Sequence, residues 1–215
     1  MSILSKTFTG LSYESRIKKF NKFINLMEPR PEDKILYIGG TIETENVYLE
    51  SFFLENYKWL GNVTIMDIGE NGLRRTKERF SEVKTCCCDV KKMPLKDKQF
   101  DISFCNAVIE HVGDYEAQKT MAEEIMRVSG RWFIATPNFW FPFELHYRLP
   151  FIHYFPYRIQ EFSKKFIGGR YPRGKMPNIN LLTAKKLQNL FPSSKIVKHR
   201  ITIWPETLIV HSSRE

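Results

Sequence analysis

The chain has 215 residues, which is enough to bury the core of one domain without disulfides or metals. Hydrophobic residues make up 42% and charged residues 27%, as in ordinary globular proteins, and no apolar run reaches the roughly 20 residues that cross a bilayer. The first 20 residues lack the apolar stretch of a secretory leader. These totals argue against a membrane-spanning or disulfide-rich class, and we expect one cytoplasmic domain over residues 1–215.

The net charge of +9 is unevenly distributed along the chain. Residues 146–215 hold 13 Lys and Arg residues but only three acidic residues, so the remainder is close to neutral. This asymmetry indicates an anionic partner for the C-terminal part. The alternative is a solvated basic surface that serves solubility.

The N-terminal half alternates helical and strand patterns. Apolar residues at helical spacing predict a helix over 13–27, within an N-terminal cap of residues 1–30. Short apolar runs followed by Gly or Asp predict buried strands. We expect strands at 34–38, 63–66 and 83–88, and helices at 43–58 and 71–80.

The alternation continues through the C-terminal half. We expect strands at 100–106 and 131–135 around a helix at 115–128, and Thr183 is typical of the cap of a helix that ends at Leu190. Two last strands, near 195–203 and 206–211, have no helix between them and should pair antiparallel. The pattern predicts an α/β fold with a doubly wound, seven-stranded sheet that is mostly parallel, with an antiparallel C-terminal strand.

The stretch after the fifth strand is unusually aromatic. Residues 139–171 contain 12 of the 30 Phe, Trp and Tyr residues, interrupted by prolines. We interpret residues 139–180 as an inserted, partly helical cover over the carboxyl edge of the sheet, where ligands bind in open α/β folds.

Cysteines occur at 86, 87, 88 and 105, a spacing that fits neither a disulfide framework nor a zinc site. We interpret them as small apolar residues in buried strands of a protein kept in a reducing compartment.

Polar and glycine residues follow three successive strands. Gly39 and Gly40 form a turn after the first strand, where backbone and a helix start can approach a ligand. Asp67 ends the second strand and can accept the hydroxyls of a ribose, and Asp89 ends the third and can read an adenine edge. Dehydrogenases share this pattern, so it does not choose a cofactor.

The middle of the chain is more specific. The segment CDVKKMPLKDKQFDISFCNAVIEHVGD, residues 88–114, and EEIMRVSGRWFIATPN, residues 123–138, resemble the central signature of class I S-adenosylmethionine-dependent methyltransferases of the type 11 kind. The segment TPNFWFPFELHYRLPFIHYFP, residues 136–156, is similar to a subgroup associated with polysaccharide or cell-surface glycan synthesis.

The resemblance implies a Rossmann-like methyltransferase fold and S-adenosylmethionine as cofactor, with S-adenosylhomocysteine as product. It implies that the cofactor-binding residues are Tyr37, Gly39, Gly40, Thr41, Glu43, Asp67, Ile68, Asp89, Val90, Asn106, Ala107 and His111. The first motif departs from the family, because Tyr37 stands where an acid is usual and Thr41 and Glu43 replace glycines. As a hypothesis, Glu43 meets the ammonium group of the cofactor instead.

Methyl transfer to a hydroxyl needs positioning and removal of a proton, for which histidine is the usual base near neutral pH. We predict His146 as general base, oriented by Glu144, with His111 as the second candidate and His153 as a third. The alternative is that Glu144 and His146 only hold the cover to the core. Some sugar methyltransferases use a divalent metal. Glu110, His111 and His146 would be the set to hold one, but no spacing requires a metal and we expect none.

The acceptor is expected to be a small molecule or glycan, and anionic, because basic residues interleave with aromatic residues over 147–175. Nucleic acid and an anionic membrane surface fit the same residue types. Asn106-Ala107-Val108-Ile109 lacks the Asn-Pro-Pro-Tyr pattern of base-methylating enzymes, which disfavours that chemistry. We expect the apolar side of 159–167 to pack on the sheet. A methyltransferase-like binding module without activity, or an RNA methyltransferase, are the competing interpretations.

Overall fold

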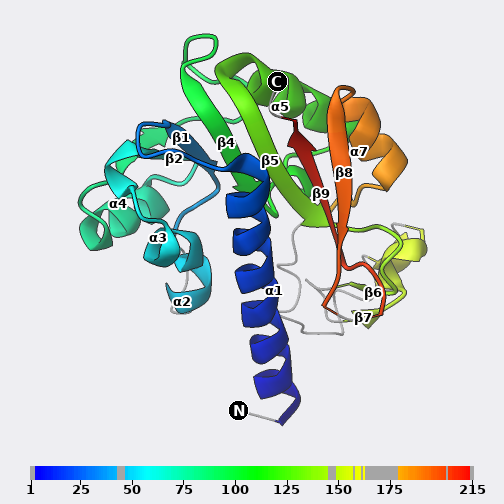
Figure 1. Cartoon of the computed structure of the whole chain (residues 1–215). Helices are drawn as coiled ribbons and strands as arrows, with labels where there is room; N and C mark the ends of the chain where they lie inside the picture. The colour runs from blue at the N-terminus through cyan, green and yellow to red at the C-terminus, as the bar shows by residue number, and fades with distance from the viewer. Residues whose placement is uncertain are drawn as a thin grey trace.

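The fold is described here from a computed structural model of the chain. It describes residues 3–42, 47–144, 149–156, 158–160, 162, 179–201 and 203–213. These residues build a central sheet with helices on both faces (Figure 1).

Seven strands form the sheet in the order β3-β2-β1-β4-β5-β9-β8. Neighbouring strands from β3 to β5 are parallel, whereas β9 is antiparallel to both β5 and β8. The strands are β1 Ile35–Ile38, β2 Val63–Asp67, β3 Lys84–Cys87, β4 Phe100–Asn106, β5 Ser129–Pro137, β8 Ser194–His199 and β9 Thr207–Ser212. The doubly wound sheet predicted from the sequence, with its antiparallel C-terminal pair, is therefore confirmed.

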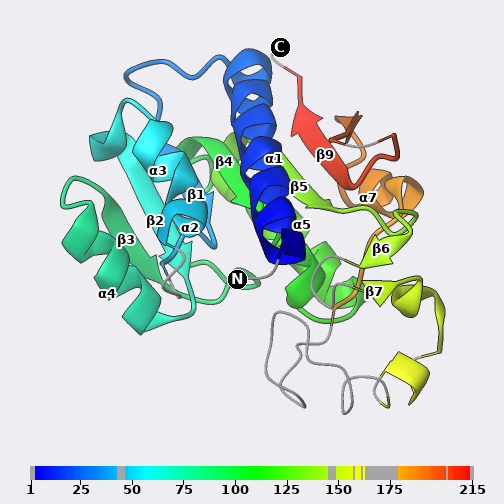
Figure 2. The same ribbon diagram turned by 90° about the horizontal axis from the view of Figure 1, so that it is seen from below.

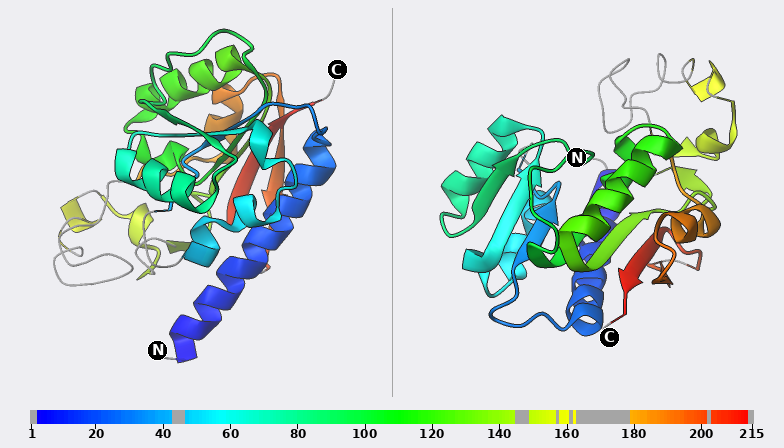
Figure 3. Two further views of the ribbon diagram at one scale, coloured as in Figure 1. Left: turned by 90° about the vertical axis from the view of Figure 1, so that its left-hand side faces the viewer. Right: turned by 90° about the horizontal axis from the view of Figure 1, so that it is seen from above.

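Each face of the sheet has its own apolar cluster, because successive residues of a strand point to opposite sides. Helices α1 Ile3–Met27, α3 Phe52–Asn56 and α4 Glu70–Arg79 contribute to one cluster, together with Tyr37 and Phe104. Helices α5 Tyr115–Val128 and α7 Ala184–Leu190 contribute to the other. Figure 3 shows α1 and α5 on opposite sides of the sheet.

Helix starts follow from capping side chains. The Asp114 carboxylate accepts a hydrogen bond from the Ala117 N–H at 3.0 Å and begins α5, and the Thr183 hydroxyl accepts from the Lys186 N–H at 3.2 Å and begins α7. Such caps satisfy amide groups that have no partner within the helix. The predicted role of Thr183 is confirmed.

The helix expected at 43–58 is wrong as a single element. Residues 43–46 lie outside the described residues, and the rest forms α2 Val47–Glu50 and α3, separated at Ser51. Phe52, Phe53 and Leu54 are all buried. Three consecutive apolar residues cannot share one helical stripe, and a short turn between α1 and the sheet buries them all.

Two further expectations need correction. The first helix begins at Ile3, well before the expected position 13. The cysteines are not all buried: Cys105 of β4 is, but Cys86 and Cys88 are half-buried and Cys87 is exposed, in and just after β3. The reason is that β3 lies at the edge of the sheet, where only one neighbour covers it.

Helix α1 runs along one face of the sheet and continues past the carboxyl ends of the strands (Figure 1). Phe23 is fully buried, with ring centroids 5.0 Å from Phe104 and 5.6 Å from Phe133. The C-terminal half of α1 belongs to the core. Because this half fixes the axis of the helix, the preceding turns extend past the edge of the sheet where ligands bind.

The segment after β5 lies at that same carboxyl edge (Figure 2). Its described parts include the two-stranded sheet of β6 Phe143–Glu144 and β7 Leu149–Pro150, followed by η3 Ile152–Tyr154. Ile159 and Phe162 are 48% and 65% exposed, so for these two residues the expected packing on the sheet is wrong. Among the helices in the described residues, none is long and apolar enough to cross a membrane.

Candidate active site

A cavity of about 230 Å³ opens at the carboxyl edge of β1 and β4. The strand ends supply its floor and α1, α2 and α3 its wall. Six of the predicted cofactor-binding residues line it, namely Tyr37, Gly39, Thr41, Asn106, Ala107 and His111. The remaining lining residues come from the helices, namely Arg16, Lys19, Phe20, Leu49, Glu50, Phe52 and Phe53, and from Phe104 of β4.

The floor depends on backbone conformations that few residues adopt. Gly39 has φ +71, and its N–H donates to the carbonyl of Met66 at 2.9 Å. A Cβ at Gly39 would lie 2.3 Å from Cγ2 of Val108. Ala107 has φ 60, which is rare for a residue with a Cβ and costs free energy that the surrounding structure must supply. Both residues line the cavity.

The Tyr37 ring explains why position 40, the second glycine of this turn, has no room for a side chain. The ring is buried, tilted against Phe53 and edge-on to Phe104, and a Cβ at Gly40 would lie 2.4 Å from Cδ1 of Tyr37. Burial raises the pKa of the Tyr37 phenol, so the hydroxyl stays protonated. The aromatic residue in place of the family's acid and the glycine at 40 therefore form a steric pair.

Asp67 is held at the end of β2 by two hydrogen bonds. Its Oδ1 accepts from the Gly69 N–H at 2.8 Å, and its Oδ2 accepts from the Thr41 hydroxyl at 3.2 Å. The Thr41 side chain thus turns toward the carboxylate as well as lining the cavity. The next residue, Ile68, is 74% exposed beside it, as an apolar surface at this edge.

Asp89 follows β3 and is half-buried. Its Oδ1 accepts from the Lys91 N–H at 2.9 Å, and its Oδ2 lies 3.5 Å from the Lys91 ammonium. The side chain of Val90 is buried in the apolar core. Asp67 and Asp89 are therefore neighbours along the edge, because β2 and β3 are parallel and adjacent.

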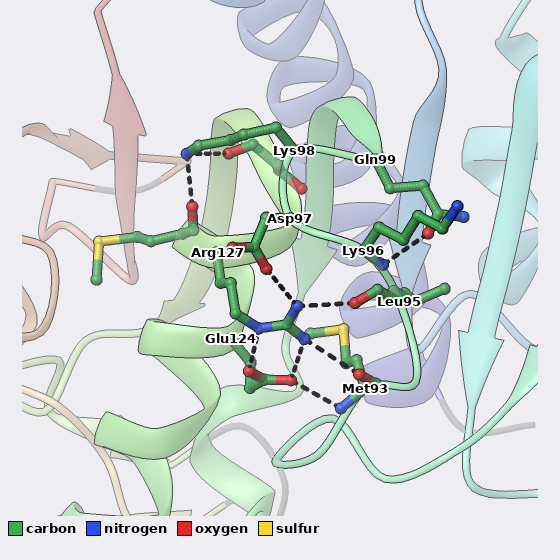
Figure 4. Close-up of polar contacts among 10 residues, drawn as sticks. Met93, Leu95, Lys96, Asp97, Lys98, Gln99, Glu124 and Arg127 are labelled. Carbon is green, nitrogen blue, oxygen red and sulfur yellow. Dashed lines mark hydrogen bonds and ion pairs between the residues drawn. The ribbon is translucent and has the colours of Figure 1, made fainter.

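The loop that follows Asp89 is fastened to α5 by one arginine (Figure 4). Arg127 donates to the carbonyls of Met93 and Leu95 and pairs with Asp97 and Glu124. The arginine lowers the pKa of Glu124. This network fixes the loop between β3 and β4 to α5, on the face of the sheet opposite to α1.

Sequence analysis did not identify the charged residues that α1 brings to the cavity. The Lys19 ammonium donates to Oδ1 of Asn106 at 2.8 Å, and Nε of Arg16 donates to the carbonyl of Leu49 at 2.7 Å. Burial, aided by the nearby Arg16 charge, lowers the pKa of Lys19 to about 8. No local pattern distinguishes these cations from the solvated face of an amphipathic helix, since only the docking of α1 turns them inward.

Three buried polar side chains, Glu110, His199 and Glu206, form a cluster near Lys19. Glu110 is fully buried and accepts from the Thr136 hydroxyl at 3.0 Å, while His199 lies 3.3 Å from the Ser15 hydroxyl and 3.6 Å from Glu206. Burial lowers the pKa of His199 to about 4 and raises the pKa of Glu206. His199 is therefore neutral at neutral pH, and the acids partly balance Lys19.

The predicted general bases are only partly placed. His111 ends the short helix η2 Ile109–His111, is exposed and lines the cavity. His146 and Glu43 lie outside the described residues, and for Glu144 the structure describes only the backbone, in β6. His153 contacts the Phe139 carbonyl at 2.9 Å within the aromatic group of the cover, and it does not line the cavity. No cluster of three metal-binding side chains occurs within the described part of the chain.

The comparisons with known proteins agree with this fold. Residues 48–131, less than half of the chain, match the family model described as a methyltransferase domain. A search of curated proteins gave no match. Solved structures resemble most of the chain at low sequence identity.

Three of these structures illustrate the likeness. The PH0226 protein of Pyrococcus horikoshii OT3 is 18% identical, with a TM-score of 0.62, and the match covers 94% of this chain and 91% of that one. Magnesium protoporphyrin IX methyltransferase of Synechocystis PCC 6803, with bound S-adenosylhomocysteine, is 14% identical over 100% and 89%, with a TM-score of 0.61. The fold is that of class I methyltransferases. The 1,6-didemethyltoxoflavin N1-methyltransferase of Burkholderia thailandensis, with bound 1,6-didemethyltoxoflavin and S-adenosylhomocysteine, is 15% identical over 93% of this chain and 79% of that one, with a TM-score of 0.58.

Proposed function

We propose that this protein is an S-adenosylmethionine-dependent methyltransferase that acts on a small anionic acceptor, with a saccharide hydroxyl as the preferred target. One observation carries the proposal: the methyltransferase-type sheet has a cavity at its carboxyl edge, built on the Gly39 turn and the end of β4. Its location matches the site where open α/β folds bind ligands. The family match over 48–131 and the neighbours with bound S-adenosylhomocysteine support the choice of cofactor.

The residues present fit this cofactor. Gly39 lines the cavity in a left-handed conformation, and the absence of a Cβ lets the turn pack against Val108. Asp67, held by Thr41 and Gly69, would accept the ribose hydroxyls, and Asp89 would read the adenine. The cavity beyond offers both signs of charge, from Arg16, Lys19 and Glu50, which suits an amino-acid end carrying an ammonium and a carboxylate.

The chain's own part in the reaction is to position the acceptor, to exclude water and to take up the proton of the acceptor hydroxyl. S-adenosylmethionine, when bound, supplies an electrophilic methyl group. The helices α1, α2 and α3 form one wall of the cavity, and holding the acceptor in line contributes several kcal/mol. His111 lines the cavity and is the base that the described residues offer, while His146 with Glu144 stays a prediction.

The glycan acceptor is the finer part of the proposal. The aromatic cover over 139–180 and its basic residues suit a sugar ring with an acidic group, since aromatic faces stack on sugars and Arg or Lys pair with anions. Trp140, Phe151 and Tyr154 are exposed on the described part of the cover and are available for such stacking.

Titration calorimetry with S-adenosylhomocysteine tests the cofactor. We expect saturable binding by the wild type, and at least tenfold weaker binding by D67N, because the amide loses the charge-assisted bonds to a diol. T41V serves as a matched control, since it removes the Thr41 hydroxyl and keeps the carboxylate, and should weaken binding much less. Absence of binding by the wild type would contradict the enzyme and favour a binding module of the same fold.

A further inference from the structure

The exposed large apolar side chains gather at one end of the molecule (Figure 1). In the described residues they lie on α1 at Tyr13 and Ile17, after β2 at Ile68, in the cover after β5, and in the loop between β8 and β9. That loop lies at the carboxyl end of β5, because Thr207 at the start of β9 pairs with Pro137. In the described part of the chain, the loops that lead into β1, β2 and β4 at the opposite end expose no large apolar side chain.

Five of these side chains define a surface that we call the apolar tip. They come from the end of the cover and from the loop between β8 and β9, namely Phe155, Ile159, Phe162, Ile203 and Trp204. Ile203 is 88% exposed and Trp204 is 58% exposed, so neither side chain belongs to the core. Single exposed apolar residues are ordinary, whereas a contiguous group of them marks a contact surface for a protein or a membrane.

The two segments of the tip are fastened together at the start of the cover. The Asn138 N–H donates to the Glu206 carbonyl at 2.9 Å, and the Asn138 side-chain amide donates to the Pro205 carbonyl at 2.8 Å. Its Oδ1 accepts from the Trp140 N–H at 3.1 Å, and the Trp140 ring centroid lies 6.2 Å from that of Tyr154 in the cover. The loop and the cover are therefore held side by side.

Basic residues accompany the tip. Arg158 and Arg200 are exposed in the same two segments, whereas Glu206, the acidic residue of the loop, is buried. In the sequence, residues 145–180 contain seven Lys and Arg residues and one acidic residue, Glu161. Apolar side chains next to clustered basic residues are the combination that binds the surface of an anionic bilayer.

The aliphatic side chains of the tip favour a bilayer over nucleic acid. Aromatic rings and cations bind nucleic acid because the rings stack on the bases. Ile159 and Ile203 have no aromatic face and cannot take part in such stacking. Lipid acyl chains accept aliphatic and aromatic side chains alike, and tryptophan is enriched at the level of the headgroups, which suits Trp204.

We propose that the apolar tip docks this protein on the surface of an anionic lipid bilayer. Phe162 and Ile203 enter the boundary between headgroups and acyl chains, while Arg158 and Arg200 meet the lipid phosphates. The docking involves neither the methyl donor nor the cavity. It is therefore tested on the whole chain without cofactor, and its outcome is separate from that of the proposed function.

Vesicle sedimentation tests the docking. The probe is a vesicle of phosphatidylcholine with about 30% phosphatidylglycerol, compared with a vesicle of phosphatidylcholine alone. The wild type should bind the anionic vesicles about tenfold or more strongly than the neutral ones. Salt at about 1 M should weaken this binding without abolishing it, because salt screens the arginines and leaves the apolar contact in place.

Substitutions in the tip separate its two contributions. I203S and F162S should each weaken binding about fivefold or more, whereas I203L and F162L keep an apolar side chain and should bind nearly as the wild type does. R200Q should bind the anionic vesicles about three- to fivefold more weakly. K195Q is the matched control, because Lys195 is exposed near the other end of β8, and it should bind as the wild type does.

Tryptophan fluorescence reports which part of the protein meets the lipid. Trp204 belongs to the tip, whereas Trp59 is half-buried and precedes β2 at the opposite end of the molecule. Vesicles with brominated acyl chains quench an indole ring that inserts among them. W204F should lose a large part of the quenching seen in the wild type, and W59F should lose none.

Several results would overturn the docking. Vesicle binding by I203S and F162S that equals the wild type would leave only the adsorption of a basic protein. Absence of vesicle binding would overturn it as well. Tight binding of an RNA oligonucleotide would then identify nucleic acid as the partner, and a concentration-dependent dimer that I203S dissociates would identify a second copy of this chain. An unchanged thermal unfolding midpoint of I203S shows that the variant is folded.

Discussion

At the scale of single residues, the unusual first turn is explained by sterics. In the sequence, Tyr37, Thr41 and Glu43 depart from the first motif of the family that the chain resembles. The structure shows that the Tyr37 ring occupies the space where a Cβ at Gly40 would lie, and that Thr41 turns its hydroxyl to Asp67. Tyr37 is thus compatible with glycine at position 40, and Thr41 with Asp67. Gly39 has the left-handed conformation that the turn requires.

We predict that G39A destabilises the protein by about 1–3 kcal/mol, because the substitution adds strain at positive φ and a clash with Val108. Urea denaturation measures the change. Gly61 is the control, since a Cβ there would meet no atom within 4 Å, and G61A should leave the midpoint nearly unchanged. Equal midpoints for G39A and G61A would contradict the account of this turn.

At the scale of elements, helix α1 has two functions along its length. Phe23 and Met27 bury their side chains in the core, which fixes the axis of the helix. One and two turns before Phe23, Lys19 and Arg16 line the cavity, and Ser15 contacts His199 of β8. The same helix therefore couples the last strands of the sheet to the candidate active site.

The contact between α1 and β8 should make stability depend on pH. His199 has a pKa of about 4 in the folded chain and about 6.5 when unfolded, so between these values the unfolded state binds more protons. Its contribution to stability is therefore lost as the pH falls from about 6.5 to 4, by up to about 1.4 kcal/mol per pH unit. The raised pKa of Glu206 acts in the opposite direction.

Comparison with H199Q isolates this group, because glutamine can keep a hydrogen bond to Ser15 without titrating. Denaturant midpoints measured at several pH values should fall less steeply with acidification in H199Q than in the wild type. Parallel curves for the two proteins would show that His199 does not cause the dependence.

At the scale of the whole molecule, the uneven charge of the chain is related to the carboxyl edge of the sheet. The basic C-terminal part contributes the cover, and α1 adds cations to the cavity from the other end of the chain. The N-terminal helix α1 and the segment around β6 and β7 both lie at the carboxyl edge (Figure 2). An anionic acceptor fits both contributions.

Ligand binding should stabilise the entire fold. S-adenosylhomocysteine at one hundred times its Kd should add about 2.7 kcal/mol to the free energy of unfolding, because it binds only the folded state. For a chain of this size the Tm should rise by roughly 5–10 °C in a thermal scan. D67N at the same ligand concentration should show a smaller rise, and an equal rise would argue against the ribose contact at Asp67.

The sequence by itself determined the order of helices and strands, the parallel sheet and the positions of Gly39, Asp67 and Asp89 at its edge. These features depend on local periodicity, turn chemistry and the strand ends, which neighbouring residues encode. Only the tertiary structure decided that Arg16 and Lys19 face the cavity and that Glu110 and His199 are buried behind them. These residues are brought together from α1, η2 and β8, and the long-range packing of α1 on the sheet, which no local pattern contains, turns a charged helical face inward.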